Sequence, residues 1–424
     1  MMIDIRHFGA VGDGITLDTI AIQKAIDSAT EQGGGTVLIP PGRWLTGALC
    51  LGNHTQLFLD AGAMLLGSRN KEDYPVMTAR WEGRTQQCHS PLIGGNGLSD
   101  VGIRGPGAID GQGEPWWLWF KEGQLDFPRP RLVSLTDCRN VVLEDFTAIN
   151  SPSWTINPVR CRGVSIRGIS ILNPPDSPNT DGINPDSCSV VRISDCFVSV
   201  GDDCITIKAG TELESDHLKA PCEDITIANC VLEKGHGGVV IGSEMSGGIR
   251  NIAITNCIFK GTDRGIRIKS RRGRGGMVED IIASNLVMVD VLSPLTVNLY
   301  YGCGAWGDEV VSDKGYRPVG AGTPRIRNLS FSGIRARGAR VAAAFIYGLP
   351  EMPVVNVSLR DYSVSMAEGC DENIPAEMAD GLPDMCRHGI WVRNVEGLSL
   401  SNIHIEGFAG EAIDIDASVS LAGS

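Results

Sequence analysis

A repeating frame of short apolar strands constrains the fold of this chain more than any other feature. The frame is clearest in RNVVLEDFTAIN from Arg139, and it returns in segments that begin at Arg162, Ser189, Glu223, Arg250, Glu279, Arg327 and Glu396. Each repeat alternates apolar with polar residues and is too small to enclose a core of its own. Stacked repeats bury their apolar positions in one continuous column, so the pattern predicts a solenoid.

The lack of helical patterns between the repeats narrows the kind of solenoid. We expect an all-β, single-domain right-handed parallel β-helix over residues 1–424, with a cap and first coil in 1–50 and coils with long inserted loops in 51–424. One helix is expected in TLDTIAIQKAIDSATEQGGG, with Asp18 as its N-cap and Gly33 to Gly35 as its end. A sandwich or propeller is the alternative, although propeller blades need four strands and about 40 residues each.

The net charge of the chain argues against nucleic acid and anionic membranes as binding partners. The chain carries 50 acidic and 37 basic residues, and its net charge of -13 disfavours binding to nucleic acid or to an anionic membrane. No apolar run approaches the ~18 residues that span a bilayer, and the opening MMIDIRHFGAVGDG has no apolar leader. The 13 cysteines lack metal-ligand spacing, so we expect structural thiols, no metal, no cofactor and a cytoplasmic location. A secreted or periplasmic mature form is the alternative, and a monomer or weak homo-oligomer is expected.

Four consecutive repeats end in strands that align residue by residue. These strands are DGINPD from Asp181, DCITIK from Asp203, GGVVIG from Gly237 and RGIRIK from Arg264. Because side chains alternate along a strand, the third and fifth positions should face the core and the fourth and sixth should face solvent. The solvent-facing positions would be Asn184, Thr206, Val240 and Arg267, followed by Asp186, Lys208, Gly242 and Lys269.

The turns that enter these strands carry ionisable side chains that could take part in catalysis or binding. They present Asp181, then Asp202 with Asp203, then His236, then Arg264. Stacked strands lie ~4.8 Å apart, so these groups would meet around one sugar-sized ligand. Mutual repulsion in a shared site raises the pKa of at least one carboxyl group, which supplies both an acid and a base. Glycosidic cleavage needs that pair, and the separation of the two groups (~5 Å or ~6.5–9.5 Å) decides between retention and inversion.

Four short motifs, in this order, resemble the polygalacturonase family, glycoside hydrolase family 28. They are NTDG (Asn179 to Gly182), GDD (Gly201 to Asp203), GHGG (Gly235 to Gly238) and RIK (Arg267 to Lys269). The upstream segments FGAVGDG from Phe8, IDGQG from Ile109 and NSPSW from Asn150 also match, so the resemblance covers most of the chain. RWEG from Arg80 and SPLI from Ser90 resemble bacterial members, which are often exo-acting.

The resemblance implies catalytic roles for four residues. Asp202 would be the general acid of an inverting hydrolase. Asp181 and Asp203 would hold and deprotonate the attacking water, and His236 would tune the ionisation of the acid.

The resemblance also implies a set of substrate-binding residues. Arg267 and Lys269 would bind the substrate carboxylate, and Asn179 belongs to the first motif of the site. Tyr301 in NLYYG would contact the sugar, with its neighbour Tyr300 as the alternative.

Some of these patterns also have structural interpretations. An isolated Asp-Asp pair, or a histidine between glycines, is usually turn chemistry, and only the alignment of the repeats favours a catalytic role. In the basic run from Arg264, Arg271, Arg272 and Arg274 are expected to form a solvated loop. In EPWWLWF from Glu114, Trp116, Trp117 and Trp119 could stack on sugar rings or pack a lateral loop against the coils, and the packing interpretation is preferred.

The expected function is hydrolysis of α-1,4-galacturonosidic bonds in polygalacturonate or oligogalacturonides, during pectin degradation. Insertions at residues 211–221, 303–323 and 368–387 would close one end of the groove and impose exo action. Rhamnogalacturonan and xylogalacturonan are alternative substrates. A pectate-lyase-like enzyme with Ca²⁺ and an arginine base, or a tailspike-like glycan-binding β-helix, is the alternative from another class.

Overall fold

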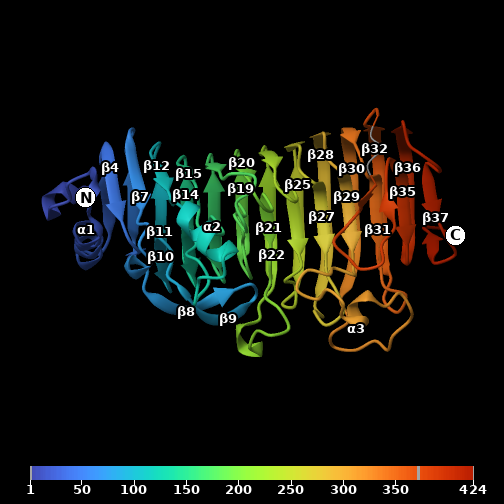
Figure 1. Ribbon diagram of the computed structural model, residues 1–424, viewed down its shortest axis with the longest axis horizontal. Coiled ribbons are helices and arrows are strands. Elements are labelled where there is room, and N and C mark those ends of the chain that lie inside the picture. Colours follow the sequence, from blue (N-terminus) through green and yellow to red (C-terminus); the bar gives the residue numbers. More distant parts are fainter. Residues whose placement is uncertain (1, 370–372, 424) are drawn as a thin grey trace. The chain divides into compact units, whose positions relative to one another are not determined.

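The computed structural model describes residues 2–369 and 373–423, and the chain divides into two compact units. The first unit ends at Asp202 and the second begins at Asp203. Each unit consists mainly of short parallel strands stacked in register (Figure 1). Among the described residues, no helix is both long and apolar enough to cross a membrane.

Three ladders of parallel strands build the first unit. The first ladder contains β1 (Met2–Asp4), β3 (Gly35–Ile39), β6 (Thr55–Leu59), β11 (Ser99–Arg104), β14 (Arg139–Glu144), β17 (Arg162–Arg167) and β19 (Ser189–Ser194). The second contains β2 (Asp13–Leu17), β4 (Gly42–Thr46), β7 (Ala63–Gly67), β12 (Ala108–Asp110), β15 (Thr147–Ile149), β18 (Ser170–Leu172) and β20 (Phe197–Val200). The third contains β5 (Leu49–Cys50), β10 (Ile93–Asn96), β13 (Val133–Thr136) and β16 (Ile156–Val159).

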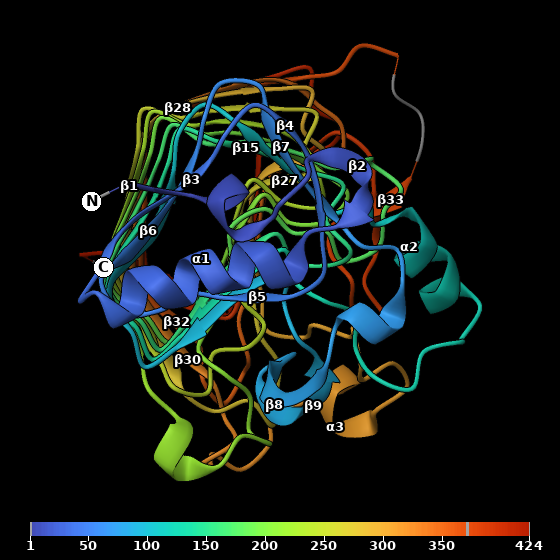
Figure 2. The same ribbon diagram turned by 90° about the vertical axis from the view of Figure 1, so that its left-hand side faces the viewer.

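Segments outside the ladders complete the first unit. The antiparallel hairpin of β8 (Val76–Trp81) and β9 (Arg84–His89) lies beside the coils (Figure 2). The helix α1 (Thr19–Glu31) lies across the open end of the first coils, with one face buried (Figure 2). The remaining elements are η1 (Ile5–Phe8), η2 (Lys71–Asp73) and α2 (Glu114–Lys121).

The second unit repeats the same construction. Its first ladder contains β22 (Cys222–Ala228), β25 (Ile249–Thr255), β28 (Met277–Val289), β30 (Arg325–Ala339), β32 (Val354–Met366), β36 (Val395–Glu406) and β38 (Val419–Leu421), and β23 (Val231–Lys234) pairs with β26 (Ile258–Lys260), which pairs with β28. The third-ladder equivalents are β21 (Ile205–Ile207), β24 (Val239–Gly242), β27 (Arg264–Lys269), β29 (Ser293–Asn298), β31 (Ala342–Tyr347), β35 (His388–Arg393) and β37 (Ile413–Ile415). The inserted segments hold η3 (Asp216–Leu218), α3 (Glu309–Ser312) and the antiparallel pair β33 (Ile374–Pro375) and β34 (Asp384–Met385).

The repeated turn residue explains why the frame is visible in the sequence. Asn251, Asn328 and Asn356 all have positive φ, a conformation that asparagine tolerates better than most residues. Their side-chain amides also bond to the equivalent residue one coil earlier. Asn251 donates to Asp224 at 2.8 Å, and Asn356 donates to Asn328 at 3.0 Å. The turn residue therefore both bends the chain and links successive coils.

The predicted all-β parallel β-helix is confirmed in each unit. The predicted helix is also confirmed as α1, although the carboxylate of Asp18 accepts from the amides of Val11 and Gly12 instead of capping the helix. Two elements were not predicted from the sequence: α2, where Pro115 stands in the first turn, and the coil that contains β32. The helix is only eight residues long, whereas β32 follows β30 at an ordinary coil spacing, with Val355 paired to Arg327, so the sequence does carry that repeat.

Candidate active site

In the first unit, Asp181 and Asp202 occupy different surroundings. Asp181 is 3% exposed, and its carboxylate accepts a hydrogen bond from the amide of Asn184 at 3.0 Å. Asp202 is half-buried and follows the tight turn at Gly201. A Cβ at Gly201 would lie 2.4 Å from the carbonyl oxygen of Ser177, so the turn requires glycine. Asp202 is therefore the more accessible of these two carboxylates.

The buried side chain of Arg129 acts on both of these acids. Burial lowers the pKa of Arg129 to about 10, against the opposing charges of Glu82, Asp181 and Asp202. Its guanidinium donates to the Oδ1 atom of Asn179 at 2.6 Å and to the carbonyl of Pro178 at 2.7 Å. Arg129 thus fixes the NTDG turn and brings a positive charge to its carboxylates. Arg129 was not predicted as a site residue, and its only signal in the sequence is the unusual FPRPRLV segment.

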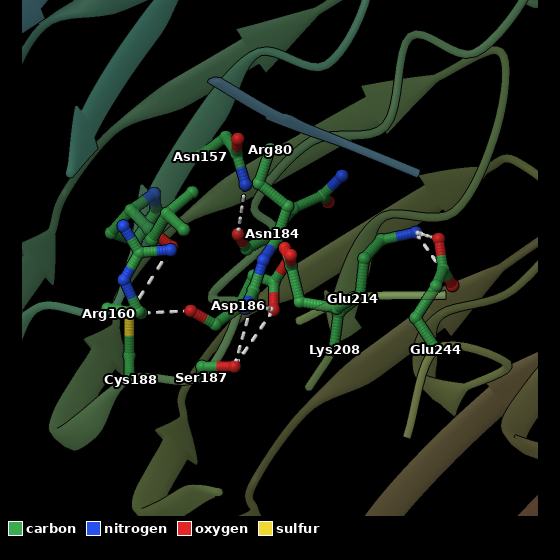
Figure 3. Close-up of polar contacts among 12 residues, drawn as sticks. Arg80, Asn157, Arg160, Asn184, Asp186, Ser187, Cys188, Lys208, Glu214 and Glu244 are labelled. Carbon is green, nitrogen blue, oxygen red and sulfur yellow. Dashed lines mark hydrogen bonds and ion pairs between the residues drawn. The ribbon is translucent and has the colours of Figure 1, made fainter. Parts of the chain in front are cut away.

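The hairpin of β8 and β9 is anchored to the same unit by a buried ion pair. Arg80 and Asp186 lie 2.7 Å apart, each side chain is 1% exposed, and Arg80 also donates to the hydroxyl of Ser187 at 2.8 Å (Figure 3). Trp81 stacks on Trp154 with a centroid distance of 4.9 Å. The hairpin therefore covers residues that the sequence placed in solvent.

In the second unit, Asp203 lies between two cations of β27. Its Oδ2 atom accepts from Lys269 Nζ at 2.9 Å, and its Oδ1 atom lies 3.7 Å from Arg267. Arg267 and Lys269 are two residues apart on one strand, so their side chains share a face. Asp203 is only 1% exposed. Two neighbouring cations therefore orient a buried carboxylate.

Tyr301, and not Tyr300, faces this cluster. The ring centroid of Tyr301 lies 5.0 Å from Lys269 Nζ and 5.6 Å from the guanidinium of Arg267. Burial raises the pKa of Tyr301 to about 12, although both cations oppose that shift. Tyr300 instead lies under Lys314, at 3.8 Å from its ring. Of the two tyrosines, Tyr301 is therefore the one whose ring lies beside Arg267 and Lys269.

Of the other predicted residues of this unit, one is exposed and two bind an inserted segment. His236 lies in the exposed turn between β23 and β24. Arg264, predicted to join the site, donates to the carbonyl oxygens of Pro375 and Ala376 at 3.0 Å and 2.7 Å, so it holds an inserted segment instead. Arg267 donates both Nε and Nη2 to the carboxylate of Glu377.

The prediction that the fourth and sixth strand positions face solvent is wrong. The side chains of Asn184, Asp186, Thr206, Lys208, Val240, Arg267 and Lys269 are all buried. Inserted segments cover these positions, as Arg80 does for Asp186 and Glu377 does for Arg267. Lys208 is likewise buried beside Glu244 at 3.3 Å (Figure 3).

The predicted solvated loop of arginines is also wrong. Arg271 and Arg274 bind the carboxylate of Glu212, and Arg272 binds that of Glu351 at 2.6 Å. These contacts tie the inserted segments to the end of β27.

Trp116 and Trp119 pack edge to face against each other, with ring centroids 5.2 Å apart. Trp116 is fully buried and meets Tyr74 edge to face at 5.3 Å. Trp117 donates to the carbonyl of Ser151 at 2.9 Å and is only partly buried.

Comparison with known proteins places this geometry in a family. Residues 75–368 match the model of glycosyl hydrolases family 28, and residues 2–64 match one described as rhamnogalacturonase A/epimerase, pectate lyase-like. A probable polygalacturonase of Vitis vinifera is 36% identical over 370 residues, which are 85% of this chain and 73% of that protein. The chain belongs to glycosyl hydrolases family 28. It is therefore a glycoside hydrolase with the parallel β-helix of its family.

The similar proteins include both exo-acting and endo-acting polygalacturonases. The crystal structure of an exopolygalacturonase from Thermotoga maritima superimposes with a TM-score of 0.82 at 28% identity, over 96% of this chain and 92% of that one. An endo-polygalacturonase of Pectobacterium carotovorum is 30% identical over 300 residues, which are 67% of this chain and 72% of that protein. Similarity alone therefore does not choose between exo and endo action in this family 28 chain.

The predicted cytoplasmic location is wrong. The family 28 proteins that it resembles are plant cell-wall polygalacturonases or secreted or periplasmic bacterial ones, not cytoplasmic enzymes. The prediction rested on two weak signals, the lack of an apolar leader in the opening residues and the unpaired cysteines. All cysteines within the described residues are free and most are buried, and a buried thiol is inert in either compartment.

Proposed function

We propose that this family 28 enzyme hydrolyses α-1,4-galacturonosidic bonds of polygalacturonate or oligogalacturonides, with inversion and from a chain end. The observation that carries the proposal is the cluster of Lys269, Asp203 and Tyr301 on one face of the second unit. A cation beside a carboxylate and an aromatic ring suits a sugar that itself carries a carboxylate. Relatives described as polygalacturonases support the same substrate.

The proposed mechanism uses three carboxyl groups. Asp202, the more accessible acid of the first unit, protonates the glycosidic oxygen as the bond from that oxygen to the anomeric carbon breaks. Asp181 and Asp203 orient a water and take its proton while it attacks the opposite face of the anomeric carbon. His236 tunes the ionisation of Asp202, and Asn179 binds the substrate or holds the turn that presents Asp181. No metal or cofactor enters this scheme.

Two buried anchors support exo action. In the first unit, Arg80 fixes the hairpin of β8 and β9, and in the second, Glu377 fixes residues 374–385. Each insertion covers part of a strand face on which a polymer would otherwise lie. Analysis of the early products from polygalacturonate tests this mode. Release of monomer alone supports exo action, whereas an early ladder of mixed oligomers overturns it.

The variant Asp202→Asn tests the catalytic assignment. We expect turnover to fall by roughly 10²–10⁴, because general acid catalysis contributes about that factor, while binding of an oligogalacturonide is retained. Asp216→Asn, at a 96% exposed side chain, is the matched control and should keep wild-type activity. Undiminished turnover in Asp202→Asn would exclude Asp202 as the acid.

The same assays separate the rival classes. A lyase would release unsaturated products that absorb ultraviolet light and would lose activity with a chelator. A tailspike-like binding protein would retain the glycan without any turnover in the wild type. The match of residues 2–64 to a rhamnogalacturonase-type model favours one further substrate, a rhamnogalacturonan backbone, and a panel of defined pectic oligosaccharides would reveal it.

A further inference from the structure

An open cavity of about 490 Å³ lies in the first unit, between α2 and the ends of four strands of the second ladder. The coil side of its lining comes from the C-terminal ends of β7, β12, β15 and β18, at Arg69, Asp110, Asn150 and Pro174. The helix α2 lies beside these coils and forms the other side (Figure 2). The volume falls within the ~300–1,000 Å³ that ligand pockets occupy, so the cavity is large enough for a small ligand.

One face of α2 borders this cavity. Glu114, Trp117, Leu118 and Lys121 all line it, and their spacing of i, i+3, i+4 and i+7 places them on a single side of the helix. Leu118 is 53% exposed, whereas Trp116 on another side of α2 is fully buried. Trp116 therefore supplies the packing of the helix, and the apolar pair of Trp117 and Leu118 is left facing the cavity.

The indole ring of Trp117 is held in a fixed orientation. Its Nε1 atom donates to the carbonyl oxygen of Ser151 at 2.9 Å, and the amide of Ser151 donates to Asn173 at 2.8 Å. A Cβ at Gly113 would lie 2.7 Å from the same carbonyl oxygen, so the close approach of α2 to this turn requires glycine. Because the ring is already positioned, a ligand that stacks on it would lose little free energy to ordering the side chain.

Asp110 and Asn150 add hydrogen-bond acceptors to the lining. The Oδ1 atom of Asp110 accepts from the backbone amide of Gln112 at 2.9 Å and from the side-chain amide of Asn150 at 3.1 Å. Within residues 2–369 and 373–423, no group donates to Oδ2 of Asp110 or to Oδ1 of Asn150. The protein therefore orients two acceptors that hydroxyl groups of a ligand can use.

The charge of the lining favours an uncharged ligand. Three of its residues are acidic and two are basic, namely Asp110, Glu114, Asp176, Arg69 and Lys121. Both cations are also engaged, since Arg69 donates to the side-chain oxygen of Gln112 at 3.2 Å and Lys121 donates to the carbonyl of Asp176 at 3.4 Å. A sugar that carries a carboxylate would meet one net negative charge here.

We propose that this cavity binds one neutral sugar residue, with a face of the sugar ring on Trp117 and Leu118 and its hydroxyl groups donating to Asp110 and Asn150. A sugar ring carries C–H bonds on its faces and hydroxyl groups around its edge. It therefore matches an aromatic and aliphatic surface that is bordered by polar atoms.

The cavity lies beside the proposed active site and is not part of it. Pro174 and Asp176 stand in the same connection after β18 as Asp181. Within the described part of the chain, however, the lining includes neither Asp181 nor Asp202. The inference does not depend on the proposed function, because binding of a neutral sugar requires no turnover.

Calorimetric titration of the full chain tests the proposal with two neutral probes, a 1,4-linked galactotriose and a 1,5-linked arabinotriose. We expect saturable binding of at least one probe by the wild type. Trp117→Ala should weaken it by ~10-fold or more, because a few aromatic anchors carry most of the energy of a binding site. Trp117→Phe keeps an aromatic ring and should lose less. Tyr316→Ala, at a 72% exposed aromatic residue of the second unit, is the control and should bind like wild type.

Asp110→Asn provides a second variant that keeps the size of the side chain. It retains one oxygen for the contacts with Gln112 and Asn150 and replaces the other acceptor by a donor. Binding of the neutral probe should weaken by ~10-fold or more, the fold-change expected for loss of a hydrogen bond to a charged group. This variant tests the cavity even if Trp117→Ala does not fold. No saturable binding by wild type, or wild-type affinity in Asp110→Asn, would overturn the proposal.

The variant Asp202→Asn separates this inference from the proposed function. It should bind the neutral probes with wild-type affinity whether or not Asp202 is the catalytic acid. The same background allows titration with trigalacturonate, and the effect of adding Trp117→Ala measures how much of that binding uses the cavity. A larger loss for trigalacturonate than for the neutral probes would show that the cavity selects a charged sugar, and it would overturn the proposal.

Discussion

At the scale of single residues, the two neighbouring aspartates differ in what surrounds them. Asp202 is half-buried and feels the charge of Arg129, whereas Asp203 is 1% exposed and bonded to Lys269. A proton donor must reach the leaving oxygen, and a base must hold water in a fixed place. The contrast in exposure and partners supports a division of roles between adjacent residues of identical chemistry.

The variant Lys269→Met tests the proposed cation. A hydrogen bond to a charged group contributes about 1.5–3 kcal/mol, so we expect kcat/KM on oligogalacturonides to fall by roughly 10- to 150-fold. Part of that loss should appear as a higher KM, because Lys269 is proposed to bind the substrate. Lys260→Met, whose side chain is 52% exposed, is the control on the neighbouring strand β26. A KM equal to that of wild type would indicate that Lys269 acts only on Asp203.

The low pKa of Glu377 predicts a dependence of stability on pH. A carboxyl group whose folded pKa lies below its unfolded value stabilises the fold above the unfolded pKa and loses that effect as pH falls through the folded one. For Glu377 the window runs from 4.5 down to about 2. The free energy of unfolding of wild type should therefore exceed that of Glu377→Gln most above pH 4.5, and the difference should shrink toward pH 2. Denaturant titrations across this pH range measure the difference, with Glu411→Gln at an exposed residue as the control. A difference that stayed constant with pH would contradict this prediction.

At the scale of elements, the coils and the positions of the long insertions were predictable, but the contacts that the insertions make were not. The frame recurs because every coil needs an apolar position inside and a turn residue that accepts positive φ, and both requirements repeat along the sequence. Glu377 meets Arg267 across 110 residues of sequence, and no repeat links them. A local pattern therefore placed Asp203 and Lys269 in one stack of coils, with β24 between β21 and β27, but it could not show that Arg267 was already bonded to Glu377.

The helix α1 allows a direct test of its role at the end of the first unit. Ile22 is fully buried on the face that packs against the coils, whereas Ile20 is 71% exposed on the same helix. Truncation of a buried isoleucine to alanine removes apolar contact and leaves a cavity, at a cost of about 2–5 kcal/mol. Ile22→Ala should therefore lower the midpoint of thermal unfolding clearly, and Ile20→Ala should leave it nearly unchanged. Equal effects in a calorimetric scan would show that α1 does not seal the coils.

At the scale of the whole molecule, the predictions are correct for features whose pattern of buried residues repeats along the chain. The ladders and the N-terminal helix lie where the repeats and the helical pattern placed them. The errors share one cause, since the solvent-facing columns, the arginine loop and the role of Arg264 were all judged without the segments that cover them. The inserted segments between the repeats decide which of the predicted surface positions are exposed. The spacing of the repeats carries no information about where those segments lie.

The cysteines provide a last test, because their burial depends on intact coils throughout the chain. Within the described residues, Cys50 and Cys303 are exposed, Cys386 is intermediate and the other cysteines are buried. A contact with Cys161, together with burial, raises the pKa of Cys138, and a contact with Cys230 and burial raise that of Cys257. Because the thiolate is the reactive form, a brief pulse of alkylating reagent should modify Cys50 and Cys303 in the native protein, while the buried thiols react only after denaturation. Mass spectrometry of the peptides would read both states. Rapid native modification of Cys138 or Cys257 would show that the coils open far more often than stacked ladders with this register should allow.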